Sequence, residues 1–444
     1  MMGSYLFTYL TIGLLFVTSL LPVLHTVVSQ RKDYFDPINW SGLLLFVIVG
    51  VPALRRVISQ DYRFYGEFTQ QAPSHVIIQM VVAATILALL CLYAGYYLSA
   101  GKKIARRLPR YSTSWSSEKA WSVIIIFLFV GYIGYFLLSG MISTGPRSQL
   151  ADGFSKYAFI AVNLLNTASI LAVSDLLMGI KYDNYKFEMR KYTKIIYVSL
   201  IVLSNAALLL NLGGRGRAFS IFIISIFLVH YLVKNTSIYG PALAFSLLYI
   251  ISSWVAEIMG NLLSFNIAGA VDTILSPYLF RDTPRIQFNQ LFIVFSSVPD
   301  ELSFQYGQTF LSAMFALFPF QPVPQTQTVY NRAFAPSAGT DYGVPITLIG
   351  ELYLNFWIPG IIVGFFICGI LIRVFYEWCI GLSRNIGGII LFSAVTNNLL
   401  LIGNFSNSAP TLGLKLLPLL VAILYISGGL LESSEASDTG SYYA

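Results

Sequence analysis

A glycine-rich turn carries two arginines in a form that suits phosphate chemistry. The segment Gly213-Gly214-Arg215-Gly216-Arg217 joins two apolar runs. Glycine permits positive φ angles and close backbone approach, and guanidinium offers a planar fork of donors that matches phosphate oxygens. At the amino end of the following helix, this turn predicts an anion site at Arg215 and Arg217. A tight turn whose arginines only anchor the chain at the membrane surface is the structural alternative.

A second cluster lies further along the chain, in the run Tyr-Leu-Phe-Arg-Asp-Thr-Pro-Arg. It brings Arg281, Asp282 and Arg285 together in an otherwise apolar neighbourhood. On a helix the two arginines would share one face, although Pro284 fits only the first turn. An Asp–Arg pair would be structural, and it would leave the second arginine for a ligand. We therefore expect an anion to bind here.

The carboxylate of Glu351 lies about seven residues before the apolar run 358–376. A carboxylate this close to lipid is costly and tends to mark a functional site. We therefore predict that Glu351 belongs to a functional site. A helix cap, or a partner for a nearby arginine, is the structural reading of Glu351.

Two further cations belong to the candidate set. Arg332 precedes Asp341 in the same segment, and Lys415 lies a few residues into the last apolar run. Lys415 either faces the same cavity or extends outward to the membrane surface, and the sequence leaves both open.

The sequence gives little support for a metal site or for covalent catalysis by a side-chain nucleophile. The three cysteines lie in or beside apolar runs without a CxxC motif, and the three histidines are scattered. These patterns argue against a zinc or histidine metal site. No Ser/His/Asp arrangement can be assembled either. We therefore expect no metal and no cofactor.

The composition identifies the class of protein that must position these residues. Of 444 residues, 56% are hydrophobic and 11% are charged, whereas an ordinary globular domain carries about 25% charged residues. So few charges cannot cover a soluble surface, which excludes a soluble enzyme, a disordered chain and a fibrous repeat. We predict an all-α polytopic membrane protein, because helices satisfy their own backbone hydrogen bonds in lipid.

Eleven apolar runs are long enough to approach the roughly 30 Å of a bilayer core. They lie at about 5–28, 42–56, 76–99, 121–141, 157–179, 195–212, 218–233, 241–260, 358–376, 386–403 and 411–430. We read residues 1–430 as a single transmembrane domain and 431–444 as a disordered cytoplasmic tail. The longest loop, 261–345, contains the apolar stretch 310–320. That stretch is too short to span and predicts a re-entrant or interfacial helix.

The Lys and Arg residues set the predicted orientation. One set of alternating loops holds sixteen of the 27, and the positive-inside rule places that set in the cytoplasm. The amino terminus and the long loop are then outside. Nine of the eleven outer basic residues are arginine, which favours anion binding there over simple solvation, although interfacial anchoring stays open. The net charge of +7 reflects topology, so no nucleic-acid partner is expected.

Read in order, these segments resemble the Wzy-type polymerases of bacterial polysaccharide repeat units, the O-antigen polymerase family. The resemblance covers roughly 210–375. It rests on the turn at 213–218, Tyr-Leu-x-Arg-Asp-Thr at 278–283 followed by Asn289, the residues 345–350, and Gly-Glu-Leu-Tyr-Leu-Asn-Phe at 350–356 leading into 360–376. The second motif looks most like the enterobacterial common antigen polymerase branch. The turn departs from the family pattern in carrying two arginines, so Arg215 and Arg217 compete for one role.

The resemblance implies a GT-C-like fold and a lipid-pyrophosphate-dependent glycosyltransferase. Such an enzyme would polymerise undecaprenyl-pyrophosphate-linked repeat units at the periplasmic face of the bacterial inner membrane, as in lipopolysaccharide O-antigen synthesis. Membrane lipids, a chain-length regulator and a flippase would be further partners. The pyrophosphate-binding cations would be Arg215, Arg217, Arg281, Arg285, Arg332 and Lys415. Glu351 would take the proton of the attacking hydroxyl as a general base, or hold that hydroxyl, with Asp282 and Asp341 as the less favoured alternatives.

Two other classes stay open. An O-antigen ligase of the same superfamily would use a histidine in its large outer loop, and 261–345 contains none. A non-enzymatic transporter of lipid-linked sugars would also need arginines on the outer face of the membrane to bind the pyrophosphate. It should show repeat symmetry and interrupted helices, and the sequence shows neither.

Overall fold

The computed structural model describes residues 2–29, 33–59, 75–111, 114–142, 154–181, 188–212, 215–233, 283–300, 302–315, 346–381, 385–399 and 405–431. These residues are almost entirely helical, which confirms the predicted all-α class. Short turns join some of the described helices, and two strands of two residues each, β1 (Arg110–Tyr111) and β2 (Leu430–Leu431), pair antiparallel.

The helices form two compact units whose segments interleave along the chain. Unit 1 comprises Met1–Leu108, Asp282–Trp378 and Asn398–Gly413, and unit 2 comprises Pro109–Arg281, Cys379–Asn397 and Leu414–Ala444. The described helices are α1 (Met2–Val28), α2 (Pro37–Leu45), η1 (Phe46–Gly50), α3 (Val51–Ser59), α4 (His75–Tyr97), α5 (Ser99–Ala105), α6 (Ser117–Ile142), α7 (Phe154–Lys181), α8 (Glu188–Asn211), α9 (Arg215–Leu228), η3 (Val229–Val233), α12 (Thr283–Ser297), α13 (Gln308–Phe315), α15 (Leu348–Tyr376), η5 (Glu377–Gly381), α16 (Ile386–Leu399) and α17 (Phe405–Ser427).

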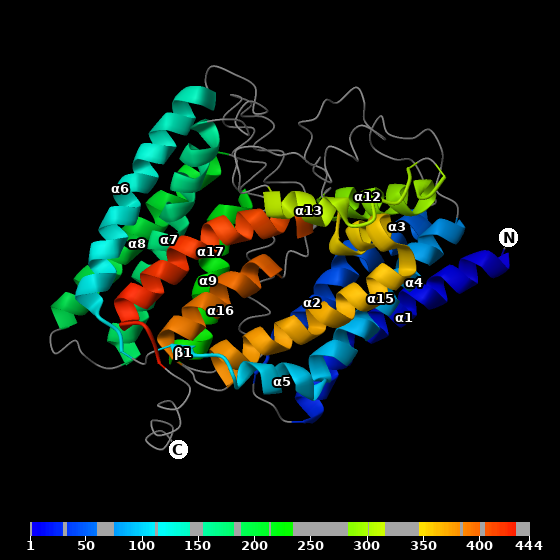
Figure 1. The fold of residues 1–444 in the computed structure, drawn as a ribbon, viewed down its shortest axis with the longest axis horizontal. Coiled ribbons are helices and arrows are strands. Elements are labelled where there is room, and N and C mark those ends of the chain that lie inside the picture. The colour runs from blue at the N-terminus through cyan, green and yellow to red at the C-terminus, as the bar shows by residue number, and fades with distance from the viewer. Residues whose placement is uncertain are drawn as a thin grey trace. The chain divides into compact units, whose positions relative to one another are not determined.

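Unit 1 is organised around α4 and α15, which lie side by side (Figure 1). Two glycines allow the two backbones to touch. A Cβ at Gly95 would collide with the carbonyl oxygen of Phe366, and a Cβ at Gly369 with that of Leu92. Close approach through small residues is a common way for helices to associate in lipid, where hydrophobic burial gives no net attraction between them. These contacts fix the register of α15, the helix that carries Glu351.

Three long helices of unit 1 run in the same direction. Near the amino ends of α1 and α4, the Gln79 side chain donates to the Thr8 hydroxyl at 2.9 Å. At the opposite ends, Tyr96 of α4 donates to Asp36, the residue that caps α2 directly after α1. Arg373, near the carboxyl end of α15, donates to the same Tyr96 hydroxyl at 3.2 Å. Thus α1, α4 and α15 are parallel, as the predicted alternation of crossings requires.

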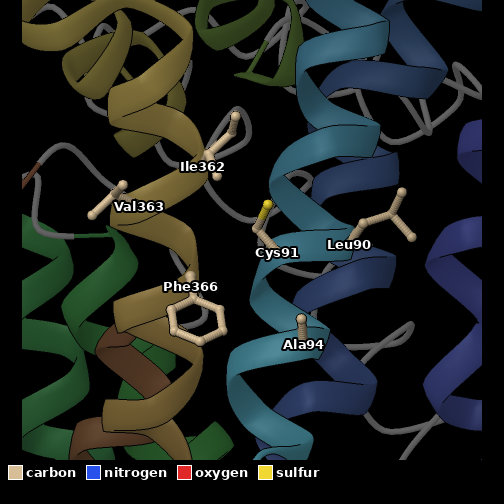
Figure 2. Close-up of a pocket in the computed structure, with 6 residues that line it drawn as sticks. All are labelled: Leu90, Cys91, Ala94, Ile362, Val363 and Phe366. Carbon is tan, nitrogen blue, oxygen red and sulfur yellow. The ribbon is translucent and has the colours of Figure 1, made fainter.

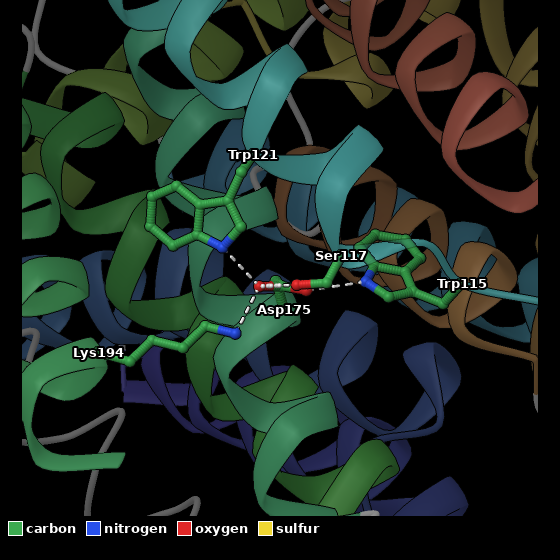
Figure 3. Close-up of polar contacts among 5 residues, drawn as sticks. All are labelled: Trp115, Ser117, Trp121, Asp175 and Lys194. Carbon is green, nitrogen blue, oxygen red and sulfur yellow. Dashed lines mark hydrogen bonds and ion pairs between the residues drawn. The ribbon is translucent and has the colours of Figure 1, made fainter. Parts of the chain in front are cut away.

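Unit 2 contains a buried carboxylate that joins three helices. Asp175 of α7 is 2% exposed and accepts hydrogen bonds from the indoles of Trp115 and Trp121 and from the Ser117 hydroxyl (Figure 3). The ammonium of Lys194 in α8 lies 2.7 Å from the same carboxylate. The carboxyl end of α7 therefore meets the amino ends of α6 and α8, so both neighbours run antiparallel to α7.

The described helices support a multi-pass membrane protein. By length and composition seven of them can cross a membrane, and they coincide with seven of the eleven predicted runs. Three shorter apolar helices, Ser220–Val233, Ile386–Thr396 and Leu416–Ser427, coincide with three more. The run 241–260 lies outside the described residues, as does the predicted tail beyond residue 431. Eleven crossings and a GT-C-like fold stay predictions.

The long loop 261–345 contains helices of its own. Helix α13 occupies the first part of the stretch expected to form a short helix, and residues 316–320 lie outside the described part of the chain. Helix α12 was not predicted, because its apolar residues are too few for a membrane span. Five successive residues of α12, Leu291 to Phe295, are nevertheless buried. This loop is therefore packed into unit 1 where it is described.

Candidate active site

The structure describes the predicted site residues to different extents. Glu351 is described in full. Arg215, Arg217, Arg285 and Lys415 have described helical backbones, but their side chains lie outside the description. Arg281, Asp282, Arg332 and Asp341 lie outside the described residues altogether. The grouping of these cations around one anion therefore stays a prediction.

The backbone positions test some local expectations. Helix α9 begins at Arg215, so the predicted placement of the two arginines at the amino end of a helix is confirmed. Helix α12 begins at Thr283, and Pro284 therefore lies in its first turn, as expected. The position of Lys415 was predicted wrongly. Helix α17 begins at Phe405, earlier than the apolar run, because its first turns contain polar residues that a hydropathy pattern leaves out.

Glu351 lies in the first turn of α15, immediately after a capped helix end. The Thr347 hydroxyl caps the helix by accepting from the Gly350 amide at 3.5 Å. The Glu351 side chain is 0% exposed, and its Oε1 atom accepts a hydrogen bond from the Thr309 hydroxyl at 3.1 Å. Buried carboxylates require such donors, because a charge without partners is costly in an apolar interior. Glu351 was predicted to lie just before this helix, but α15 begins at Leu348 and therefore includes Glu351, because the polar residues of its first turns do not register as an apolar run.

A directional chain of hydrogen bonds ends on this carboxylate. The Gly307 amide donates to Asn355 Oδ1 at 2.9 Å, which fixes the orientation of the Asn355 side chain. Asn355 Nδ2 then donates to the Thr309 hydroxyl at 2.7 Å, and Thr309 donates to Glu351. Each group accepts from the one before it and donates to the next. The chain holds the Glu351 side chain in one position.

Sequence reasoning missed Thr309 and Asn355 as partners of Glu351. The sequence did contain a signal for Asn355, because a residue four positions after Glu351 lies on the same face of the helix. Its Nδ2 also donates to the Glu351 backbone carbonyl at 2.7 Å. Thr309 had none, because it lies in α13 and reaches α15 only through the tertiary fold. A further link, from the Gln305 amide to the Leu354 carbonyl at 3.0 Å, holds the two segments together.

Helix α15 is interrupted nearly two turns beyond Glu351. Trp357 has φ 58° and ψ −150°, so α15 consists of a short first helix, a break, and a longer apolar helix. Pro359 explains why regular helix fails here, since its ring clashes with the carbonyl of Asn355 four residues earlier. The break leaves Phe356 and Trp357 45% and 53% exposed. Helix α15 thus carries a buried carboxylate in its first turn and two exposed aromatic side chains at its break.

Unit 1 holds a second polar cluster that sequence reasoning did not identify. We call Asp33, Asp36, Tyr96, Arg373 and Tyr376 the carboxylate–tyrosine cluster; Tyr96 donates to Asp36 and Tyr376 to Asp33. Burial raises the pKa of Asp36 to about 7, with Tyr96 opposing the rise and Asp33 adding to it. Asp33 and Tyr376 are 343 residues apart in sequence, so no local pattern could have joined them.

An apolar groove of about 310 Å³ lies between α4 and α15 (Figure 2). Its lining has no charged side chain and consists of Leu90, Cys91, Ala94, Ile362, Val363 and Phe366. Such a lining offers dispersion contacts alone, which suits the acyl chains of surrounding lipid and gives no means of holding a polar substrate. The groove is therefore distinct in chemistry from the Glu351 region.

The Glu351 region is the candidate active site. It combines a buried, hydrogen-bonded carboxylate, an interrupted membrane helix and exposed aromatic rings. Within the described residues, no group of three or more His, Cys, Asp or Glu side chains gathers in a way that could hold a metal ion. Comparison with protein-family models, with curated proteins and with solved structures found no match to this chain.

Proposed function

We propose that this protein is a glycosyltransferase that polymerises undecaprenyl-pyrophosphate-linked oligosaccharide repeat units. The proposal places the reaction at the periplasmic face of a bacterial inner membrane and gives the protein a GT-C-like architecture. Its main support is the environment of Glu351. The segment Gly-Glu-Leu-Tyr-Leu-Asn-Phe, which carries the family resemblance, is also where a buried carboxylate is held by Asn355 and Thr309 beside a break in a membrane helix.

In the proposed reaction, a hydroxyl of one lipid-linked repeat unit attacks the anomeric carbon of a glycan carried on undecaprenyl pyrophosphate. A new glycosidic C–O bond forms, and the bond from the anomeric carbon to phosphate breaks. Undecaprenyl pyrophosphate leaves with the electron pair. The proton of the attacking hydroxyl passes to the Glu351 carboxylate, with Asp282 and Asp341 as alternative acceptors.

The leaving group gains negative charge as the bond to the anomeric carbon breaks. Donors that are already oriented toward that charge lower the barrier, since they need no reorganisation during the reaction. We propose that Arg281 and one of Arg215 or Arg217 make these contacts, with Arg285, Arg332 and Lys415 as further candidates. The start of α9 at Arg215 supports this assignment, because a helix amino terminus favours bound anions.

A transporter of lipid-linked sugars is the second candidate, and one observation favours it. Transporters often form their substrate sites at interrupted membrane helices, and α15 is interrupted at Trp357. The polymerase, the ligase and the transporter differ in what they do to the glycan. A polymerase joins repeat units, a ligase of the same superfamily transfers glycan to a second lipid, and a transporter leaves the glycan unchanged.

Purified protein incubated with a lipid-linked repeat unit tests these candidates. A ladder of products differing by one repeat unit supports the polymerase. Transfer to a different lipid, or recovery of unchanged substrate from protein that is folded, would overturn it.

A further inference from the structure

Two aromatic residues of the candidate active site have backbone angles that ordinarily require glycine. Among the described residues, the non-glycine residues with positive φ are Tyr306, at 45°, and Trp357, at 58°. A bulky side chain in this region is strained, and such strain concentrates at binding and catalytic sites, where the surrounding structure enforces it. Glycine would adopt either conformation without strain. The presence of large aromatic side chains at both positions therefore needs a reason beyond folding.

The two residues lie in segments that pack together. The amide of Gly307, next to Tyr306, donates to Asn355, and the ring of Phe310 stacks on Phe356 with centroids 6.0 Å apart. Tyr306 is 78% exposed and Trp357 is 53% exposed. Both side chains are thus exposed, and the segments that carry them are held together by the contacts that also orient Glu351.

The polar neighbours of these aromatic residues indicate what they contact. Aromatic and amide side chains alternate in the segment Phe304-Gln305-Tyr306-Gly307-Gln308, and Gln308 is exposed. Amides both donate and accept hydrogen bonds, which a lipid chain cannot use. The lipid-suited groove between α4 and α15 contains no such group (Figure 2). A ligand with one apolar face and many hydroxyls matches this mixture.

We propose that Tyr306 and Trp357 form a binding site for a pyranose ring of the glycan substrate, with Gln308 hydrogen-bonding to its hydroxyls. The inference rests on the proposed function for its choice of substrate. The C–H face of the sugar packs on the aromatic rings, which supply a large apolar surface, while the Tyr306 hydroxyl adds a polar group. The chain Gly307–Asn355–Thr309 links this site to Glu351 and keeps the bound ring in register with the carboxylate.

Saturation-transfer NMR with lipid-free sugars tests the site on the full chain in nanodiscs. The probes are the methyl β-glycosides of glucose, galactose and N-acetylglucosamine, with octane as an apolar control. We expect transfer to the C–H protons of one sugar face for at least one glycoside. Tyr306→Gly and Trp357→Gly should weaken binding by up to about tenfold each, which is the upper range for stacking on one aromatic ring. Both variants should fold at least as well as wild type, because glycine relieves the strain.

Tyr306→Phe and Trp357→Phe keep an aromatic ring and should retain most of the binding. Leu371→Ala, at an exposed position elsewhere on α15, is the matched control and should change nothing. The proposal is overturned if wild-type protein shows no transfer to any glycoside, if transfer occurs to octane alone, or if the glycine variants bind as wild type does. If a glycine variant fails to fold, Tyr306→Leu or Trp357→Leu, which removes the ring but keeps an apolar side chain, takes its place and should weaken binding to the same extent.

A parallel polymerisation assay separates this inference from the proposed function. If the protein makes no polymer but binds sugar in a way that depends on Tyr306 and Trp357, the sugar site is supported and the polymerase function is overturned. If both glycine variants still make polymer at the wild-type level, the sugar site is overturned and the polymerase function is not.

Discussion

Asn355 lies one helical turn beyond Glu351 and connects that residue to a different helix. Its Nδ2 atom lies 2.7 Å from the Glu351 carbonyl oxygen and 2.7 Å from the Thr309 hydroxyl, which in turn donates to the Glu351 carboxylate. A single amide thus ties the first turn of α15 to α13. This arrangement makes the carboxylate part of a rigid unit, as a positioned catalytic group requires.

Arginine-to-lysine substitutions test the proposed pyrophosphate contacts. Lysine keeps the charge but offers a point donor in place of the planar fork, so Arg281→Lys should reduce polymer almost as severely as Arg281→Ala. The same should hold at either Arg215 or Arg217. Polymer length and amount on whole cells, normalised to protein in the membrane, provide the measurement.

The control for this series is Arg110→Lys, which lies in β1 and is predicted to face the cytoplasm. It should leave polymer unchanged. Full synthesis by the lysine variants at positions 215, 217 and 281 would contradict direct phosphate binding by these arginines.

The carboxylate–tyrosine cluster predicts a dependence of stability on pH. Burial raises the folded-state pKa of Asp36 from 3.8 to about 7. Between these values the folded protein keeps a proton that the unfolded chain has released, so the free energy of unfolding falls as pH rises from about 4 to about 7 and levels off above that. We expect the thermal midpoint in nanodiscs to drop between about pH 4 and 7, and Asp36→Asn to flatten this drop.

Glu118→Gln is the matched control for Asp36, since Glu118 is an exposed carboxylate at the start of α6. It should keep the wild-type pH profile. A profile for Asp36→Asn that falls as steeply as wild type would show that another group controls the effect.

Asp175 should be a major contributor to the stability of unit 2. Asp175→Ala leaves Lys194 and two indole donors without their shared acceptor, and losing one partner of a buried ion pair typically costs about 3–5 kcal/mol. Lys194→Ala should cost less, because three hydrogen bonds to the carboxylate remain. Thermal unfolding of the two variants in the same detergent measures the difference, and equal losses would contradict this account.

The orientation of the chain can be tested by cysteine labelling. In a variant without its three native cysteines, an impermeant reagent added from outside should reach cysteine at positions 300 and 335 and should not reach positions 108 and 188. This pattern follows from the distribution of Lys and Arg residues. The reverse pattern would place the long loop in the cytoplasm and remove the proposed periplasmic site.

Hydropathy and helix periodicity were sufficient to predict the main features of the fold. The apolar runs located the long helices, because a span must be both apolar and about 20 residues long. The same reasoning missed α12, whose burial depends on packing against other elements rather than on lipid. It also placed the start of α17 too late. A helix end that lies among polar residues cannot be recognised from a hydropathy profile.

The candidate site could be predicted only in part, for a related reason. Glu351 was identifiable because a carboxylate beside an apolar run is rare, and Asn355 shares its face through local helical spacing. Thr309 and Tyr306 reach the site from a segment over forty residues away, which only the tertiary fold brings close. Pro359 indicates a disturbed helix, but it does not indicate that Trp357 adopts a positive φ.

The most direct test of the central claim is an in vitro polymerisation assay that compares wild type with Glu351→Gln. The proposal predicts a ladder of lipid-linked products for wild type. Glutamine keeps the size and hydrogen bonding of the side chain but cannot accept the proton, so we expect a rate lower by about 10²–10⁴-fold at normal membrane levels. No ladder from folded wild-type protein would contradict the proposed function. A near-wild-type rate for Glu351→Gln would remove Glu351 from the chemistry and favour Asp282 as the base.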